Sequence, residues 1–162
     1  MTSSQTETVP GSTQASSTTK TPGPAATVQA FLDALGRRDV TAALAVVDPR
    51  AVVTIHPLEV VAAGRDALRA MLDDLVRAFP DLLVTSGRII TTGDVVTALI
   101  KVEGTQAADY AGAINQEKHL DIDQAWRFAV TGDVITGVAA YWCQQQLYRR
   151  LAVKRFDAIA IA

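Results

Sequence analysis

Two long segments, residues 95–105 and 117–130, alternate between polar and apolar side chains, and this alternation constrains the fold more than any other feature. Successive side chains on a strand point to opposite faces, so both segments are predicted strands with one face in the core. The even positions are mainly apolar and are expected to point inward. The odd positions of the second segment carry a row of polar residues, His119, Asp121 and Asp123.

The rest of the chain predicts helices first and further strands afterwards. Apolar side chains at helical spacing indicate helices over residues 27–35, 40–47 and 66–79. Strands are predicted over residues 51–56, 82–92 and 134–143, and residues 144–155 form a closing helix or an irregular segment. This order is typical of an α+β fold, here a cone-shaped α+β barrel in which N-terminal helices cover a curved, mainly antiparallel sheet. An apolar cavity at its centre would be the natural small-molecule site.

Composition bounds the domain and its partners. Residues 1–25 are rich in Ser, Thr and Pro and predict a disordered tail, which leaves residues 26–162 as the domain. No apolar run is long enough to span a membrane. A formal net charge of −2 does not indicate the basic surface that binding to nucleic acid requires. The single cysteine, Cys143, excludes an internal disulfide and favours a cytoplasmic location.

The parity of the strands separates the candidate site residues. His119, Asp121 and Asp123 are expected outside, and a metal site is not expected because few further ligands are available to converge on them. The inward positions hold two neutral amides, Gln106 and Gln124, which can donate and accept hydrogen bonds. Trp126 is either a flat wall for a planar ligand or a plain core residue.

Three further residues are candidates, the first two of them at the mouth of the cone. His56 ends the first predicted strand and is either a structural histidine or a proton donor. Tyr110 lies in the loop 106–116 and is either a lid contact or a surface aromatic residue. Trp142 belongs to the last strand and is a candidate substrate contact. Because that strand is apolar on both faces, a second copy of the sheet is expected to cover it in a homodimer.

Four stretches resemble the SnoaL-like polyketide cyclase family of the nuclear-transport-factor-2-like superfamily. They are FLDALGRRDVTAALAVVDPRAVV, GRDALRAMLDDLVRAFPDLLVT, TTGDVVTALIKVEGTQ and WRFAVTGDVITGVAAYW. The resemblance implies a cofactor-free α+β barrel enzyme that acts on a hydrophobic aromatic polyketide.

Two positions depart from the pattern of the cyclases in this family. A Gly-Thr-His strand end and an aspartate in the penultimate strand carry their aldol ring closure. This chain has Gly104-Thr105-Gln106 at the first position and Trp126 at the second, with Asp123 as the nearest acid. In this respect, and in the segment YWCQQQLYRRLAVKR, the chain is similar to the anthracycline hydroxylase branch. That similarity implies O2 as co-substrate, a separate quinone reductase as partner, and no bound metal or flavin.

Three hypotheses follow. The first is hydroxylation of a reduced polycyclic quinone, with Trp126 against the rings, Gln106 and Gln124 bonding the oxygens and His56 donating a proton. The second is a polyketide cyclase in which a bulge turns Asp123 inward. The third is a non-catalytic accessory subunit that binds the aromatic ligand.

Overall fold

The structure, a computed structural model, describes residues 22–153. Its elements, in chain order, are α1 (Pro24–Gly36), α2 (Val40–Ala45), β1 (Val47–Ile55), the 3-10 turn η1 (His56–Leu58), β2 (Val60–Ala63), α3 (Arg65–Ala78), β3 (Leu83–Thr92), β4 (Val95–Thr105), β5 (His119–Thr131), β6 (Val134–Trp142) and α4 (Gln144–Arg150).

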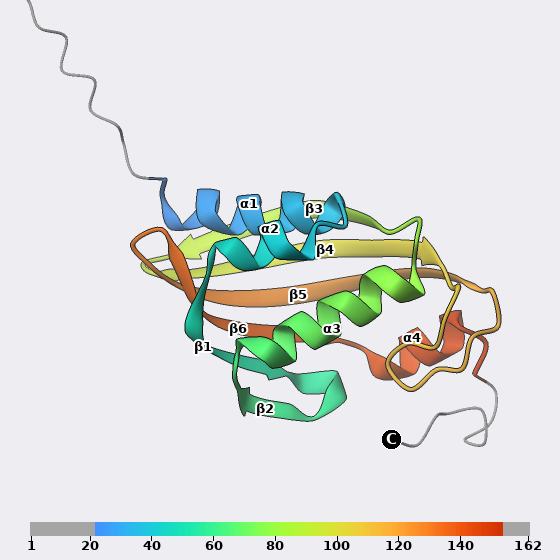
Figure 1. Cartoon of the computed structure of the whole chain (residues 1–162). Coiled ribbons are helices and arrows are strands. Elements are labelled where there is room, and N and C mark those ends of the chain that lie inside the picture. The colour runs from blue at the N-terminus through green and yellow to red at the C-terminus, as the bar shows by residue number, and fades with distance from the viewer. Residues whose placement is uncertain (1–21, 154–162) are drawn as a thin grey trace, which may run out of the picture.

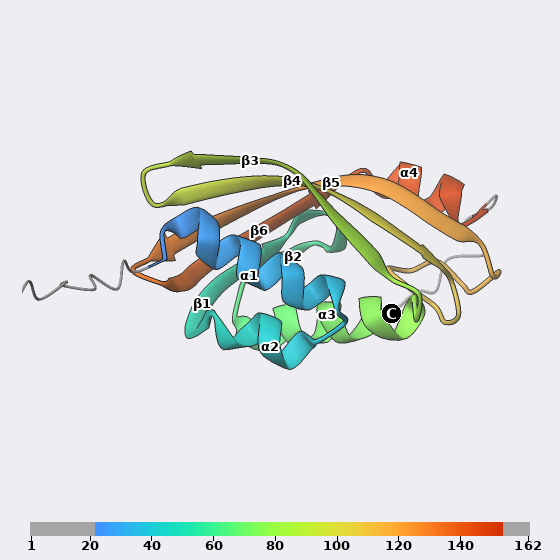
Figure 2. The same cartoon turned by 90° about the horizontal axis from the view of Figure 1, so that it is seen from above.

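The strands form one curved sheet in the order β2-β1-β6-β5-β4-β3 (Figure 1). β1 runs parallel to β6, and every other neighbouring pair is antiparallel. Figure 2 shows α1, α2 and α3 on the same side of this sheet. The predicted α+β cone with helices over a mainly antiparallel sheet is therefore confirmed, although the sheet remains open at its edges.

Local sequence explains the covering helices. α1 begins with proline, whose fixed φ suits the first helical turn, and buries Phe31 and Leu35 on one face. Asp39 caps α2 because its carboxylate accepts a hydrogen bond of 2.9 Å from the backbone N–H of Ala42. α3 is amphipathic and turns its apolar stripe towards the sheet, with Leu68, Leu72 and Leu75 buried.

The predicted strand parity is confirmed. Burial alternates along β4 and β5, and the even positions are the buried ones. Pairing between these strands is unbroken from Val95↔Ala129 to Thr105↔His119. No bulge therefore turns Asp123 inward, as the cyclase hypothesis required.

Other boundaries differ from the sequence prediction. β1 begins at Val47 rather than residue 51, and its pairing with β6 is irregular between Val47 and Val52, where Pro49 lies. β2 was not predicted. α4 ends at Arg150, so the expected helix to residue 155 is shorter, and residues 154–155 lie outside the described part. α1 begins at Pro24, inside the predicted tail, while residues 1–21 also lie outside the described range.

Aromatic rings fill the centre of the cone. Trp126 is 1 % exposed and packs against Phe31 and Phe128, with ring centroids 6.0 and 6.1 Å away. Phe31 and Phe128 meet edge-on at 5.4 Å. Of the two alternatives for Trp126, a wall of a cavity or a plain core residue, its burial supports the core residue, and aromatic rings pack where the central chamber was expected.

Candidate active site at the mouth of the cone

A pocket of about 550 Å³ lies at the end of the cone where β1 and β4 finish. Four segments surround it: η1 with the residue after it, α3, the loop between β4 and β5, and α4. Its lining residues are Pro57, Leu58, Glu59, Met71, Asp74, Tyr110, Ala111, Gly112, Gln144 and Tyr148. This volume lies in the size range of small-molecule sites.

The charged groups of the pocket are acidic. Glu59 and Asp74 are exposed carboxylates in the lining, and no Lys, Arg or His is among the described lining residues. Asp74 already pairs with Arg77 one turn along α3, at 2.7 Å. The remaining lining is apolar, aromatic or amide, so the pocket disfavours an anionic ligand.

Tyr110 is the most deeply buried aromatic residue of this lining. It is 3 % exposed and meets the ring of Phe79 edge-on, with centroids 5.3 Å apart. Its hydroxyl has no hydrogen-bond partner within residues 22–153. Burial, with a smaller contribution from the Asp74 carboxylate, raises the pKa of Tyr110 well above its ordinary value.

Gln106 is buried beside the pocket, where it holds the loop. Its Nε2 donates to the carbonyl of Ala113 at 3.2 Å, and its Oε1 accepts from the backbone N–H of Gln116 at 3.2 Å. Both ends of the carboxamide are therefore occupied by the loop that follows it. The structure gives Gln106 a positioning role, whereas the sequence suggested direct contact with a ligand.

The other inward polar groups also bond to one another. Trp126 Nε1 donates to Gln124 Oε1 at 2.8 Å, and Gln124 is 5 % exposed. Trp142 Nε1 donates to Gln144 Oε1 at 2.8 Å, and Gln144 Nε2 donates to the carbonyl of Ala111 at 2.7 Å. Trp142 thus supports the mouth through Gln144, which itself lines the pocket.

The side chains of His56 and Asp123 do not line the mouth pocket, although His56 directly precedes the lining residue Pro57. Asp123 lies on the sheet face opposite α1–α3, here called the open face. The His56 ring is exposed and stacks on Tyr141 of β6, with centroids 4.2 Å apart. Asp123 is exposed opposite Lys101 of β4. Neither side chain belongs to the mouth pocket, so neither supplies it with an acid or base in this arrangement.

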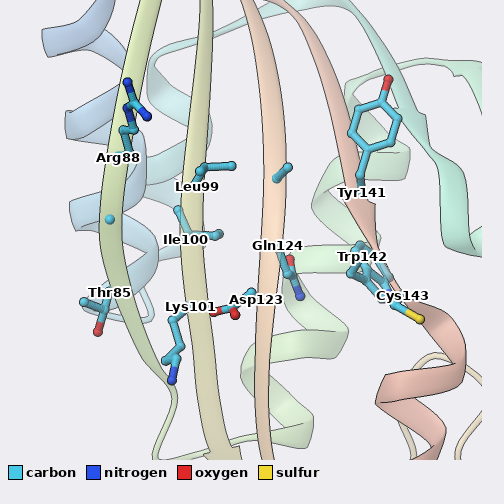
Figure 3. A pocket seen from close by; sticks show the side chains of 12 residues that line it. Thr85, Arg88, Leu99, Ile100, Lys101, Asp123, Gln124, Tyr141, Trp142 and Cys143 are labelled. Atoms are coloured by element: carbon cyan, nitrogen blue, oxygen red, sulfur yellow. The ribbon is translucent and has the colours of Figure 1, made fainter.

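The open face carries a second, larger depression of about 860 Å³ (Figure 3). Its side chains come from four neighbouring strands, and Leu99, Lys101, Asp123 and Tyr141 are among them. Leu99 and Tyr141, at the middle of the sheet, are 43 % and 41 % exposed. This shape and composition suit a docking surface.

Two kinds of feature are absent from residues 22–153. Within that range, no three His, Cys, Asp or Glu side chains gather as metal ligands would. None of the helices found there has both the length and the hydropathy that crossing a bilayer requires.

Several lining residues could not be found from sequence patterns. Met71 and Asp74 lie on a helix whose period predicts only a core face, and α4 was left open between a helix and an irregular tail. The one sequence signal for these lining residues was a run of three glutamines that begins at Gln144, two residues after Trp142.

The profile of the SnoaL-like domain family matches residues 28–138. Among solved structures, AclR of Streptomyces galilaeus, assigned as a hydroxylase, is 17 % identical, with a TM-score of 0.70 over 80 % of this chain and 81 % of AclR. IdmH of Streptomyces antibioticus, assigned as a polyketide cyclase, is also 17 % identical, with a TM-score of 0.70 over 81 % and 99 % of the two chains. A protein of Jannaschia sp. CCS1, assigned as a SnoaL-like polyketide cyclase, is 15 % identical, with a TM-score of 0.72 over 82 % and 93 %. The comparison with proteins of curated function gives no match.

Proposed function

The chain belongs to the SnoaL-like domain family, and we propose that it is a polyketide-tailoring enzyme that hydroxylates a reduced polycyclic quinone with O2. The ring system would enter the mouth pocket between α3 and α4. Structural relatives assigned as a hydroxylase and as cyclases make both chemistries relevant, and the residues of the pocket favour the first.

The observation that carries this proposal is the absence of an imidazole from the described lining of the mouth pocket. An aldol closure needs groups that take up and return protons at carbon. The carboxylates of the lining, Glu59 and Asp74, are both exposed, and Asp74 is paired with Arg77. The resemblance implies that Gln106 stands at the histidine position of the family's cyclases, and its carboxamide bonds to the loop that follows it. Asp123 lies on the open face. Oxygenation of an electron-rich hydroquinone needs fewer catalytic groups than an aldol closure. The protein has chiefly to orient the substrate and to form neutral hydrogen bonds with it.

The reaction balances without a cofactor bound to this chain. The hydroquinone, with two more hydrogens than its quinone, supplies two electrons and two protons. One atom of O2 enters the ring as a hydroxyl group and the other leaves as water, while the hydroquinone returns to the quinone. A separate quinone reductase must therefore supply the substrate in its reduced form, and we place both proteins in the cytoplasm.

The proposal includes a homodimer formed through the open face. Along β4 and β5 this face has an acidic end with Glu103 and Asp123, an apolar middle with Leu99, and a basic end with Arg127. Lys101, within the acidic end, is paired with Asp121 at 3.2 Å. A twofold axis through the middle would place the acidic end of one copy on the basic end of the other.

The proposed activity is tested with a hydroxyanthraquinone that has been reduced under nitrogen and then mixed with the protein in oxygenated buffer. The expected product carries one additional oxygen, seen by mass spectrometry, in excess over a protein-free mixture that only reoxidises. If the excess is absent, hydroxylation is rejected. Ring closure of an open-chain polyketide under nitrogen would instead identify a cyclase.

A further inference from the structure

The hydroxyl of Tyr110 is the one buried side-chain polar atom without a hydrogen-bond partner in residues 22–153. Buried polar groups in folded proteins are almost always paired, because an unpaired group has lost its water and gained nothing in return. Tyr110 is among the lining residues of the mouth pocket, and a ligand that enters there and uncovers the hydroxyl would supply its missing partner.

The backbone around Tyr110 is held from both sides. Tyr110 and Ala113 exchange backbone hydrogen bonds of 3.0 and 2.8 Å across a two-residue turn, in which Ala111 and Gly112 have φ of 50° and 87°. Gln144 bonds the carbonyl of Ala111, and Gln106 bonds that of Ala113. A non-glycine residue at positive φ is costly, so the segment accepts strain to hold this turn.

The chemistry of the phenol is restricted by its surroundings. Burial and the nearby Asp74 carboxylate both raise its pKa, so the phenol stays protonated at physiological pH. It is therefore a neutral O–H donor whose natural partner is an oxygen acceptor. The carboxylates of Glu59 and Asp74 make the same pocket unfavourable for anions.

We propose that Tyr110 binds a carbonyl oxygen of a neutral, planar ligand in the mouth pocket, and that Glu59 and Asp74 exclude anionic analogues. The inference rests on the proposed function for the identity of the site and adds the recognition group and the charge of the ligand. A quinone or ketone oxygen meets the requirement, whereas carboxylated or phosphorylated compounds do not.

Calorimetric binding tests the proposal without oxygen or turnover. The two probes are 2-(hydroxymethyl)anthraquinone, which is neutral, and anthraquinone-2-carboxylate, which has the same ring system. The wild type is expected to bind the neutral probe at least tenfold more tightly. Tyr110→Phe should weaken that binding at least fivefold, while Tyr141→Phe, which removes a hydroxyl group on the open face outside the mouth pocket, should change it less than twofold.

Two further variants complete the test. The double variant Glu59→Gln, Asp74→Asn should bring the affinity for the carboxylate to within threefold of that for the neutral probe. Without ligand, Tyr110→Phe should melt at or above the wild-type temperature, because it removes an unpaired buried group and keeps the ring. Equal binding of both probes, binding of neither, or unchanged binding by Tyr110→Phe would overturn the proposal. A failed hydroxylation assay with these binding results would reject only the activity.

Discussion

Gln124 and Trp126 lie two residues apart on the inward side of β5, and their side chains satisfy one another. The hydrogen bond of 2.8 Å between them is formed where both residues are 5 % exposed or less. A buried indole N–H needs such an acceptor, since it cannot reach water.

Replacing Gln124 by Leu is expected to lower the free energy of unfolding by about 1–3 kcal/mol, because the indole N–H of Trp126 loses its acceptor. Urea denaturation of Gln124→Leu, Trp126→Phe and the double variant measures the coupling between the two side chains. The double variant should lose less than the sum of the two single losses. Additive losses would contradict the pairing.

Gly104 is needed because its neighbours leave no room for a side chain. A Cβ at this position would lie 2.9 Å from the Cβ of Phe79. Gly104→Ala is therefore expected to lower the free energy of unfolding by about 1–3 kcal/mol. Gly36→Ala is the matched control, since its Cβ would meet only the carbonyl of Val84 at 3.8 Å. Thermal unfolding measures both, and equal stabilities would contradict the close packing.

For single residues, the sequence predicted which way a side chain points better than it predicted which group the side chain bonds to. Alternation alone placed Gln106, Gln124 and Trp126 on the inward side. It could not reveal that these polar groups bond to residues nearby in the structure, such as Ala113, because a period gives orientation and not contacts. The unpaired hydroxyl of Tyr110 had no sequence signal, since it depends on how a loop packs.

Among the elements, the loop between β4 and β5 is anchored at its start by Asp81. The Asp81 carboxylate accepts a hydrogen bond of 2.7 Å from the backbone N–H of Thr105 at the end of β4. This bond is the main cause that lowers the pKa of Asp81 below its ordinary value. The interaction therefore links the entry to β3 with the strand end beside the mouth pocket.

A lowered pKa makes the contribution of Asp81 pH-dependent. The stabilisation is present above the pKa of the unfolded state, near 3.8, and is lost as the pH falls through the lower folded value. Asp81→Asn should be less stable than the wild type at pH 7, by less than about 1 kcal/mol because the side chain is exposed. Denaturation at pH 7 and pH 3 should show this difference shrinking at the lower pH. A difference that grows there would contradict the linkage.

The elements differ in how well the sequence predicted them. α3, β4 and β5 were predicted closely because each has a long, regular period. The strand predicted for β1 was too short and β2 was not predicted, because Pro49 and Pro57 are typical strand breakers. In the structure, Pro49 lies where the pairing of β1 with β6 is irregular, and Pro57 lies in a 3-10 turn.

On the scale of the whole molecule, the open face of the sheet is the surface proposed to bind a second copy. Leu99→Asp is expected to raise the dissociation constant of the dimer by at least about 100-fold, because each interface would bury two unpaired charges. Sedimentation velocity at micromolar concentration measures the change. The proposal expects a dimer for the wild type and a monomer for the variant.

Ile114→Asp is the matched control for the dimer. Ile114 is 39 % exposed, close to the 43 % of Leu99, but lies in the loop between β4 and β5 and outside the open-face depression. The Ile114→Asp variant should remain dimeric. A monomeric wild type, or loss of the dimer in both variants, would contradict assembly through the open face.

The architecture of the molecule was predictable because helices before a meander of strands leave few ways to cover one sheet. The position of the site was not. The sequence placed it in a central chamber, but Phe31, Trp126 and Phe128 fill that space, and the pocket lies at the mouth. The volumes of the side chains decide between a central chamber and a pocket at the mouth, and the hydrophobic periodicity of the sequence does not encode these volumes.

Entry of a neutral aromatic ligand at the mouth of the cone is tested by a crystal structure of the protein saturated with 2-(hydroxymethyl)anthraquinone. We expect the rings between α3 and α4, with a carbonyl oxygen about 2.5–3.0 Å from the hydroxyl of Tyr110. Rings bound instead against Leu99 and Tyr141 on the open face, with the mouth pocket free of ligand, would contradict entry at the mouth.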